Sequence, residues 1–329
     1  MNNESRENPM RESLTPGVWG VVATPFQGST LDVDLDSLSE LVEHYESIGA
    51  TGLTVLGVFG EAAALTSGER RKVLEIAVEC TDLPLVVGVT ALATRPAIEE
   101  IRAAQEVARG RLAAVMVQAN SPKAELVIAH LEAIHRATGA KVVLQDYPLA
   151  SGISISAAAL ISVVNWCAFV VAVKAEAPPT SVAIAELSAA VGVSVFGGLG
   201  GQGLLDELMA GAAGAMTGFS YPEALIACVR AWERDGYEAA RDQLLPYLPL
   251  INFEQQAKVA LAVRKECLLK RGLIKDAGVR SPAAGFPENL RYGMLTHLRE
   301  AAAALEKASA SASSAAVDAH WSASQAGRN

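Results

Sequence analysis

One lysine in this chain ends a strand-like run that is otherwise apolar. Lys174 closes the run VVAVK at residues 170–174. Burial of an ammonium group disfavours its charged form, and a neutral amine in a shielded pocket is the nucleophile that attacks a ketone to form a Schiff base. The alternative is a lysine that reaches solvent or pairs with a carboxylate. The position of Lys174 favours the nucleophile.

A second group of polar residues ends the run KVVLQDYP at residues 141–148. Gln145 and Tyr147 are two positions apart, so on a strand they share one face, and Asp146 points to the other face. Tyr147 is placed to act as a proton donor. The alternative is a packing tyrosine that leads into Pro148, and the sequence leaves both interpretations open.

Weaker signals come from a carboxylate, a glycine run and the histidines. Glu61 follows Gly60 after the run GLTVLGV, and a structural carboxylate bonded to loop amides is the favoured interpretation. The run GGLGGQG at residues 197–203 fits either an anion site or tight packing. No histidine pairs with Asp, Glu or another His at metal-ligand spacing, so we expect no catalytic metal.

Strand-like and helix-like segments alternate along the chain and would position these residues. Near-continuous apolar runs, typical of parallel strands buried on both faces, occupy residues 17–26, 52–58, 84–90, 113–119, 141–148, 170–176, 193–200 and 214–220. Helical spacing of apolar residues marks 36–48, 67–80, 95–108, 124–138, 156–164, 180–191 and 203–210. The alternation predicts an α/β fold, a (β/α)8 TIM barrel, with its active site at the C-terminal ends of the strands. A doubly wound sheet is the rival, but its G-x-G-x-x-G turn is missing after the first run.

Only helices are expected after Tyr221, at residues 224–235, 237–248, 253–271 and 289–307. The first of these completes the barrel. We therefore predict a disordered N-terminus over residues 1–14, a barrel over 15–235 and a C-terminal helical extension over 236–307. The Ala/Ser-rich tail at 308–329 has little to bury and is expected to be disordered.

Composition narrows the functional classes. The net charge of −9 argues against a nucleic-acid binder and against an anchor on anionic lipid. No C-x-x-C pair occurs among the 4 cysteines, which indicates free thiols in a reducing compartment. The N-terminus has no apolar signal region, so a cytoplasmic location is expected. Residues 148–173 carry no charge, but Gly152, Asn165 and several serines favour a buried helix and strand over a membrane span.

With a lysine on the sixth strand of a barrel, the sequence resembles the dihydrodipicolinate synthase / N-acetylneuraminate lyase family of class I aldolases over residues 15–305. The motifs that carry the likeness are GVWGVVATPF, GVFGEAAALTSGER, the Pro148 and Gly152 pair, VVAVKAE and GAAGAMTGFSYPE. The resemblance implies a covalent imine between Lys174 and pyruvate or a related 2-keto acid, with no separate cofactor. It also implies a homo-oligomer, usually a tetramer built from dimers.

The sequence departs from the family pattern at the expected proton relay. Gln145 stands where the family has a tyrosine, and Val58 and Phe59 replace two threonines. Asn120 and Ser121 replace a tyrosine pair, and Ala150 replaces the arginine that binds the acidic second substrate of dihydrodipicolinate synthases. We therefore expect Tyr147, or a water held by Gln145, to manage protons.

The substrate-binding residues we expect are Val58, Phe59, Gly60, Thr24, Asn120 and Gly198. Backbone N–H groups around Val58–Gly60 are candidates for the carboxylate, and Phe59 favours a bulky or aromatic aldehyde portion. The leading hypothesis is a 2-keto acid aldolase or a 2-keto-3-deoxy sugar acid dehydratase. The alternatives are a 4-hydroxy-tetrahydrodipicolinate synthase with a modified relay and a catalytically silent barrel that binds a small acid.

Overall fold

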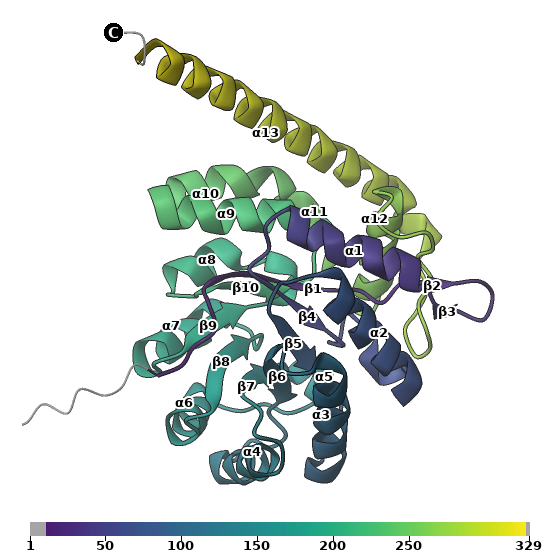
Figure 1. Cartoon of the computed structure of the whole chain (residues 1–329), viewed down its shortest axis with the longest axis vertical. Helices are drawn as coiled ribbons and strands as arrows, with labels where there is room; N and C mark the ends of the chain where they lie inside the picture. The colour runs from purple at the N-terminus through teal and green to yellow at the C-terminus, as the bar shows by residue number, and fades with distance from the viewer. Residues whose placement is uncertain (1–10, 327–329) are drawn as a thin grey trace, which may run out of the picture.

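The computed structural model describes the backbone of residues 11–326 and the side chains up to residue 310. Parallel strands close into a barrel in the order β1-β10-β9-β8-β7-β6-β5-β4 (Figure 1). They are β1 Gly17–Val21, β4 Gly52–Val55, β5 Leu85–Gly88, β6 Leu112–Gln118, β7 Val142–Asp146, β8 Val170–Ala175, β9 Ser194–Gly197 and β10 Gly214–Thr217. Each strand falls on one of the predicted runs, so the TIM-barrel prediction is confirmed.

Helices cover the outside of the barrel, as Figure 1 shows. They are α1 Leu35–Ser47, α2 Ser67–Cys80, α3 Thr94–Ala108, α4 Ala124–Thr138, α6 Ala157–Trp166, α7 Thr180–Ala190, α8 Leu204–Met209 and α9 Pro222–Asp235. Short elements join them: the hairpin β2 Phe26–Gln27 and β3 Asp32–Val33, α5 Pro148–Ser151, and the 3-10 turns η1 Ala62–Ala64 and η2 Leu199–Gly201. The uncharged stretch at 148–173 forms α5, α6 and the start of β8, as predicted.

Local sequence explains where these helices begin. Asp34 accepts a hydrogen bond from the backbone N–H of Ser37 at the start of α1. Thr66 and Glu69 form a reciprocal capping box at the start of α2, which satisfies amides that have no partner within the helix. These caps fix the junctions between the barrel strands and the helices that follow them.

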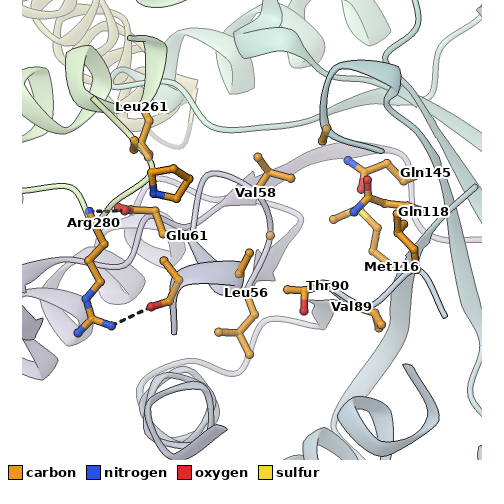
Figure 2. A pocket seen from close by; sticks show the side chains of 18 residues that line it. Leu56, Val58, Glu61, Val89, Thr90, Met116, Gln118, Gln145, Leu261 and Arg280 are labelled. Carbon is orange, nitrogen blue, oxygen red and sulfur yellow. Dashed lines mark hydrogen bonds between the residues drawn. The ribbon is translucent and has the colours of Figure 1, made fainter. Parts of the chain in front are cut away.

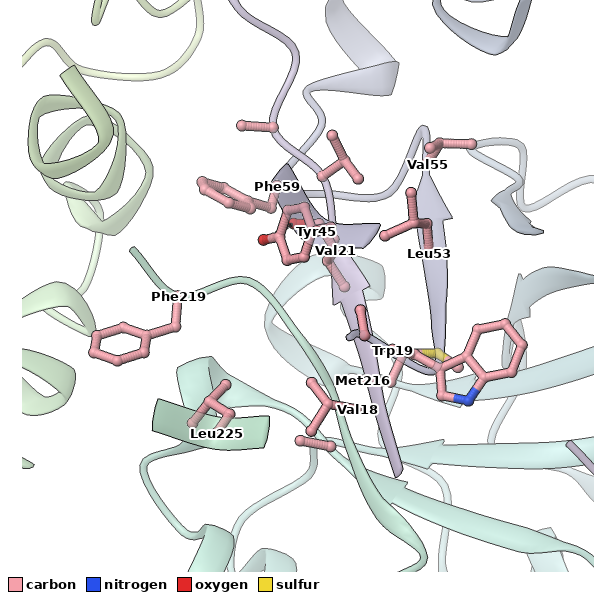
Figure 3. Close-up of a cluster of buried hydrophobic side chains, with 14 of the residues drawn as sticks. Val18, Trp19, Val21, Tyr45, Leu53, Val55, Phe59, Met216, Phe219 and Leu225 are labelled. Carbon is pink, nitrogen blue, oxygen red and sulfur yellow. Dashed lines mark hydrogen bonds between the residues drawn. The ribbon is translucent and has the colours of Figure 1, made fainter. Parts of the chain in front are cut away.

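A large apolar core lies between the strands and the helices. Figure 3 shows Val18, Trp19 and Val21 of β1 beside Leu53 and Val55 of β4. All of these side chains are buried. Burial of apolar surface stabilises the folded state by about 25 cal/mol per Å², and this is the main contribution that holds such a barrel closed.

The C-terminal extension packs against one side of the barrel and differs in detail from the prediction. Its elements are α10 Tyr237–Leu244, η3 Leu245–Tyr247, α11 Leu248–Glu254, α12 Ala260–Lys270, η4 Glu288–Leu290 and α13 Arg291–Ala326. The single helix expected at 253–271 is wrong, because the chain breaks between α11 and α12, where Lys258 adopts a left-handed φ of 70°. The helix expected at 237–248 gives way to η3 where Pro246 removes a backbone donor.

The predicted disordered ends are shorter than expected where the structure describes them. Arg11 donates hydrogen bonds to the carbonyls of Val164, Cys167 and Val170, and Leu14 is buried. Residues 1–10 lie outside the described residues, so the structure does not test the prediction of disorder there. The backbone of α13 is helical to Ala326, beyond the Lys307 boundary expected for the extension. Among the described residues, no helix combines the length and apolar character needed to cross a bilayer.

Candidate active site

Three polar side chains stand at one level across neighbouring strands at the C-terminal mouth of the barrel. The register pairs Gln118 of β6 with Gln145 of β7, and Gln145 with Lys174 of β8. Lys174 is in turn paired with Phe196 of β9. The parallel register therefore brings together side chains that are far apart in the sequence.

Lys174 is buried and pairs with a carboxylate on its own strand end. Its Nζ lies 3.2 Å from Oε2 of Glu176, and both side chains are almost fully buried. Gln145 donates to the same oxygen through Nε2 at 2.7 Å, and the amide N–H of Leu199 reaches Oε1 at 3.4 Å. Glu176 thus has the position of a proton acceptor for the Lys174 ammonium, held by hydrogen bonds from Gln145 and Leu199.

Further acidic groups surround this pair. Burial raises the pKa of Asp146 to about 6, and the nearby Glu176 adds to the effect. Burial also raises the pKa of Glu207 to about 7, although a hydrogen bond from Thr180 opposes this. The pKa of Tyr147 is raised, first by burial and then by Glu176. Two carboxyls and a phenol near Glu176 therefore release their protons at a higher pH than usual.

The glycine-rich run leaves room for the buried carboxylates. An ideal Cβ on Gly198 would lie 2.2 Å from Oε1 of Glu176, and one on Gly197 would lie 1.8 Å from Oε2 of Glu207. Any side chain at either position would collide with a carboxylate. Of the two interpretations of this run, the contacts therefore support tight packing at Gly197 and Gly198.

A cavity of about 240 Å³ opens in front of Lys174. Tyr147, Gln145 and Glu176 line it from the strand ends, and Val58 and Phe59 line it from the loop after β4. Arg264, Gln255 and Lys258 reach it from the C-terminal extension. The barrel and the extension together therefore enclose the candidate site.

A second, mostly apolar cavity of about 470 Å³ adjoins the first and shares Val58, Met116 and Gln145 with it. Figure 2 shows Met116, Gln118 and Gln145 on one wall, with Leu261, Glu61 and Arg280 on the opposite wall. The two cavities give the mouth a chamber of mixed polarity at Lys174 and an apolar chamber over β4–β7.

The loop between the chambers is held in an unusual backbone conformation. Leu56 and Glu61, which flank it, both have left-handed φ values of 57° and 52°. Thr24 donates to the carbonyl of Gly60 at 2.7 Å. The Glu61 carboxylate pairs with Lys265 at 2.5 Å and accepts the backbone N–H of Arg280 at 2.9 Å. Such strain costs about 1–3 kcal/mol per residue, so these contacts are what keep Val58 over the cavity.

The structure brings together only part of the predicted site. Lys174, Tyr147, Gln145, Val58 and Phe59 line the cavity. The other predicted residues do not line it: Thr24 and Gly60 brace the loop, Gly198 packs on Glu176, and Asn120 donates to the Leu92 carbonyl at 2.9 Å. Among the described residues, no group of 3 or more His, Cys, Asp or Glu gathers where it could hold a metal ion.

Sequence reasoning missed Glu176 and the residues that the C-terminal extension brings to the cavity. Glu176 was visible as a strand-end residue two positions after Lys174, which is the spacing of a shared face. Arg264 and Gln255 gave no such signal, because they lie on the extension, which the sequence does not place over the barrel mouth.

Comparison with known proteins identifies the family to which the chain is similar. The model of the dihydrodipicolinate synthetase family matches residues 15–300. The L-2-keto-3-deoxyarabonate dehydratase of Azospirillum brasilense is 28% identical over 306 residues, which cover 88% of this chain and 96% of that protein. The 4-hydroxy-tetrahydrodipicolinate synthase of Kosmotoga olearia is 32% identical over 141 residues, 42% of this chain and 47% of that protein.

Solved structures show the same architecture. The dihydrodipicolinate synthase of Rhodopseudomonas palustris superposes with a TM-score of 0.81 at 28% identity, covering 88% of this chain and 99% of that chain. The fold and the family match define a TIM-barrel lyase. The chain belongs to the dihydrodipicolinate synthetase family.

Proposed function

We propose that this enzyme is a Schiff-base-forming lyase that acts on pyruvate or a related 2-keto acid. The observation that carries the proposal is Lys174, a buried amine that faces a cavity of about 240 Å³ and has a carboxylate 3.2 Å away. Fold alone does not define a reaction, so the proposal rests on this side-chain arrangement.

The chemistry begins when the Lys174 ammonium loses a proton to Glu176. The neutral amine adds to the keto carbon of the substrate, and the resulting carbinolamine loses its hydroxyl as water to give an imine. Loss of a proton from C3 then gives an enamine. The enamine either adds to an aldehyde, which forms a C–C bond, or expels a C4 hydroxyl that leaves as water with an added proton. Hydrolysis of the imine returns the lysine.

Three residues are assigned to proton transfer. Glu176 takes the lysine proton and returns it to the departing hydroxyl of the carbinolamine. Gln145 fixes Glu176 through its hydrogen bond of 2.7 Å. Tyr147, whose pKa is raised by burial, serves as the acid toward the substrate hydroxyl or aldehyde oxygen.

The loop after β4 and the neighbouring chamber accommodate the rest of the substrate. Among the described residues, none accepts a hydrogen bond from the amide N–H groups of Val58, Phe59 or Gly60, so these are candidates for the carboxylate beside the keto group. The apolar chamber, which is continuous with the same loop, is the candidate site for the remainder of the carbon chain.

We favour dehydration of a 2-keto-3-deoxy sugar acid over synthesis of dihydrodipicolinate. The dehydratase relative matches over 96% of its length, whereas the synthase from Kosmotoga olearia matches over 47%. Ala150, in the apolar chamber, supplies no charge for an acidic second substrate. An aldolase, a synthase with a modified relay and a silent barrel remain the competing hypotheses. The imine requires no separate cofactor, and a homo-oligomer, usually a tetramer in this family, remains a prediction.

Reductive trapping tests the proposal. The protein is incubated with pyruvate and borohydride, and intact mass and peptide mapping then locate the adduct. We expect one adduct at Lys174 and none in Lys174→Met. No adduct with any 2-keto acid would support the silent barrel. Release of water from 2-keto-3-deoxyarabonate identifies the dehydratase, and condensation of pyruvate with aspartate semialdehyde identifies the synthase.

A further inference from the structure

Arg264 is a buried cation in the Lys174 cavity whose donors are not used by the protein. Its side chain is 11% exposed, and no described residue accepts a hydrogen bond from it. The Glu254 oxygen nearest its Nε lies at 3.7 Å, beyond hydrogen-bond distance. Both Glu254 oxygens are already engaged by the amide and hydroxyl of Ser220.

The Nε of Arg264 is sealed from solvent without a hydrogen-bond partner, which is costly unless something compensates it. Burial of a charge without a hydrogen-bonded partner costs several kcal/mol. The face of Phe59, 5.4 Å from the Arg264 Cζ, gives a modest cation–π attraction only. Burial raises the pKa of Glu254 to about 7, so this carboxyl is a poor counter-charge near neutral pH. The free donors of Arg264 therefore point to an anionic partner that enters the cavity.

A second donor converges on the same place. The Nε2 atom of Gln255 is buried and has no hydrogen-bond partner among the described residues. An ideal Cβ on Gly200 would lie 1.8 Å from Gln255 Nε2 and 3.0 Å from Arg264 Nη2. Gly200, at a left-handed φ of 67° and without a Cβ, therefore lets both donors lie against its backbone at the wall of the cavity. A planar guanidinium beside an amide donor matches the two oxygens of a carboxylate.

We propose that Arg264 and Gln255 form a carboxylate subsite of the Lys174 cavity, supplied by the C-terminal extension. This inference rests on the proposed function, because the carboxylate belongs to the keto acid whose carbonyl Lys174 attacks. The carboxylate is either the one beside the keto group or a second one at the far end of a dicarboxylic keto acid. The subsite uses side chains of the extension instead of the amides of Val58–Gly60, and it gives the extension a role in substrate selection.

Trapping with two keto acids tests the subsite. Pyruvate and 2-oxoglutarate are titrated against the wild type and Arg264→Met in the presence of borohydride, and the concentration for half-maximal adduct is read from intact mass. Removal of a charged hydrogen-bond partner raises this concentration by roughly 10- to 100-fold. A rise for both acids assigns the subsite to the carboxylate beside the keto group. A rise for 2-oxoglutarate alone assigns it to the second carboxylate.

Two further variants control for loss of charge and loss of the guanidinium shape. Lys270→Met removes a partly exposed charge from the same helix and is expected to change neither titration. Arg264→Lys keeps the charge but loses the planar fork, and is expected to give an intermediate rise. If Arg264→Met does not fold, Arg264→Lys and Gln255→Leu carry the test. The proposal is overturned if Arg264→Met reaches half-maximal adduct at the same concentration as Lys270→Met for every keto acid that forms an adduct with the wild type.

A binding measurement separates this inference from the proposed function. Calorimetry with pyruvate and with succinate, both without borohydride, is performed on Lys174→Met and on the double variant with Arg264→Met. The subsite predicts carboxylate binding in the single variant that weakens at least 10-fold in the double variant. Absence of any imine in the wild type would overturn the proposed function but leave this result standing. Equal affinity in the single and double variants contradicts the subsite.

Discussion

Lys174 and Lys265 are both buried amines paired with a glutamate, and they differ in what else surrounds them. Lys265 is fully buried, and its Nζ donates to Glu61 at 2.5 Å and to the Gly278 carbonyl at 2.8 Å. It also lies 4.0 Å from the centre of the Phe26 ring. Lys174 has one carboxylate at 3.2 Å and faces a cavity.

The difference predicts that burial alone does not make a lysine reactive. Lys265 has its donors satisfied by protein groups and joins the extension to the loop after β4. Lys174 keeps a free approach to its nitrogen. The arginines repeat the contrast: Arg280 is bonded to the carbonyls of Leu31 and Ala64 and to Glu69, whereas Arg264 has no hydrogen-bond acceptor among the described residues.

The largest effect is expected at Lys174. Lys174→Met removes the nucleophile, so exchange of the pyruvate methyl protons with deuterated water should fall by roughly 10⁴-fold or more. Proton exchange followed by NMR reports enamine formation without an aldehyde. Lys265→Met should keep the exchange in its folded fraction. Exchange that persists in Lys174→Met would remove the contrast between the two lysines.

Lys265→Met should affect stability instead. It leaves Glu61 buried without its counter-charge, which typically costs about 3–5 kcal/mol of unfolding free energy. Urea unfolding at neutral pH measures the loss. Lys174→Met should cost less, because Glu176 keeps its bonds to Gln145 and Leu199. Equal losses in the two variants would contradict the different roles assigned here.

Glu176→Gln sharpens the role of the partner carboxylate. The substitution preserves shape but removes the proton acceptor, so we expect methyl-proton exchange to slow by roughly 10³-fold. Far-ultraviolet circular dichroism should match that of the wild type. Glu186→Gln, an exposed change on α7, is the control. A rate unchanged from that control would assign the Lys174 proton to another group.

Tyr147→Phe should have a smaller effect. If the phenol donates a proton to the substrate, turnover should decrease by about 10²-fold while the trapped adduct at Lys174 still forms. The retained adduct separates proton donation to the substrate from imine formation. Wild-type turnover in this variant would make Tyr147 a packing residue, the other interpretation of its position before Pro148.

The smallest effect is expected at Glu69, whose partner Arg280 also donates its backbone N–H to Glu61, the partner of Lys265. Hydrogen bonds from Arg280 lower the pKa of Glu69 from 4.5 to about 2. A lowered folded-state pKa means that this stabilisation is present above pH 4.5 and is lost as the pH falls toward 2. Because Glu69 is partly exposed, we expect Glu69→Gln to remove about 1 kcal/mol of that acid sensitivity. Chemical denaturation across this pH range measures it, and an acid sensitivity equal to that of the wild type would contradict it.

The barrel was predictable because its signal is local. Each buried strand is a short apolar run, and each helix has its own periodicity, so the sequence alone places all the barrel strands. The break between α11 and α12 was not predictable in this way. Residues 255–259 carry no proline or glycine, so no local signal marks the break at Lys258, and its left-handed φ of 70° is known only from the structure.

The candidate site likewise contains residues that the sequence predicts and residues that only tertiary contacts place. Lys174, Gln145 and Tyr147 were found because the fold rule places strand ends at the mouth. Thr24 and Asn120 follow strands as well, but their side chains bond to the Gly60 and Leu92 carbonyls instead of lining the cavity. Position at a strand end does not determine which of several neighbours a side chain contacts.

The sequence by itself determined the alternation of buried strands and helices and the single lysine that ends an apolar strand, because both depend on residues close together in the chain. Only the tertiary structure decided that Glu176 and Gln145 join Lys174 while Glu61 saturates Lys265. The same holds for Arg264, which the extension carries to the cavity. These pairings join residues that strand register and helix docking bring together. A buried charge without a partner is destabilising, so the folded state is the one in which these charges are paired.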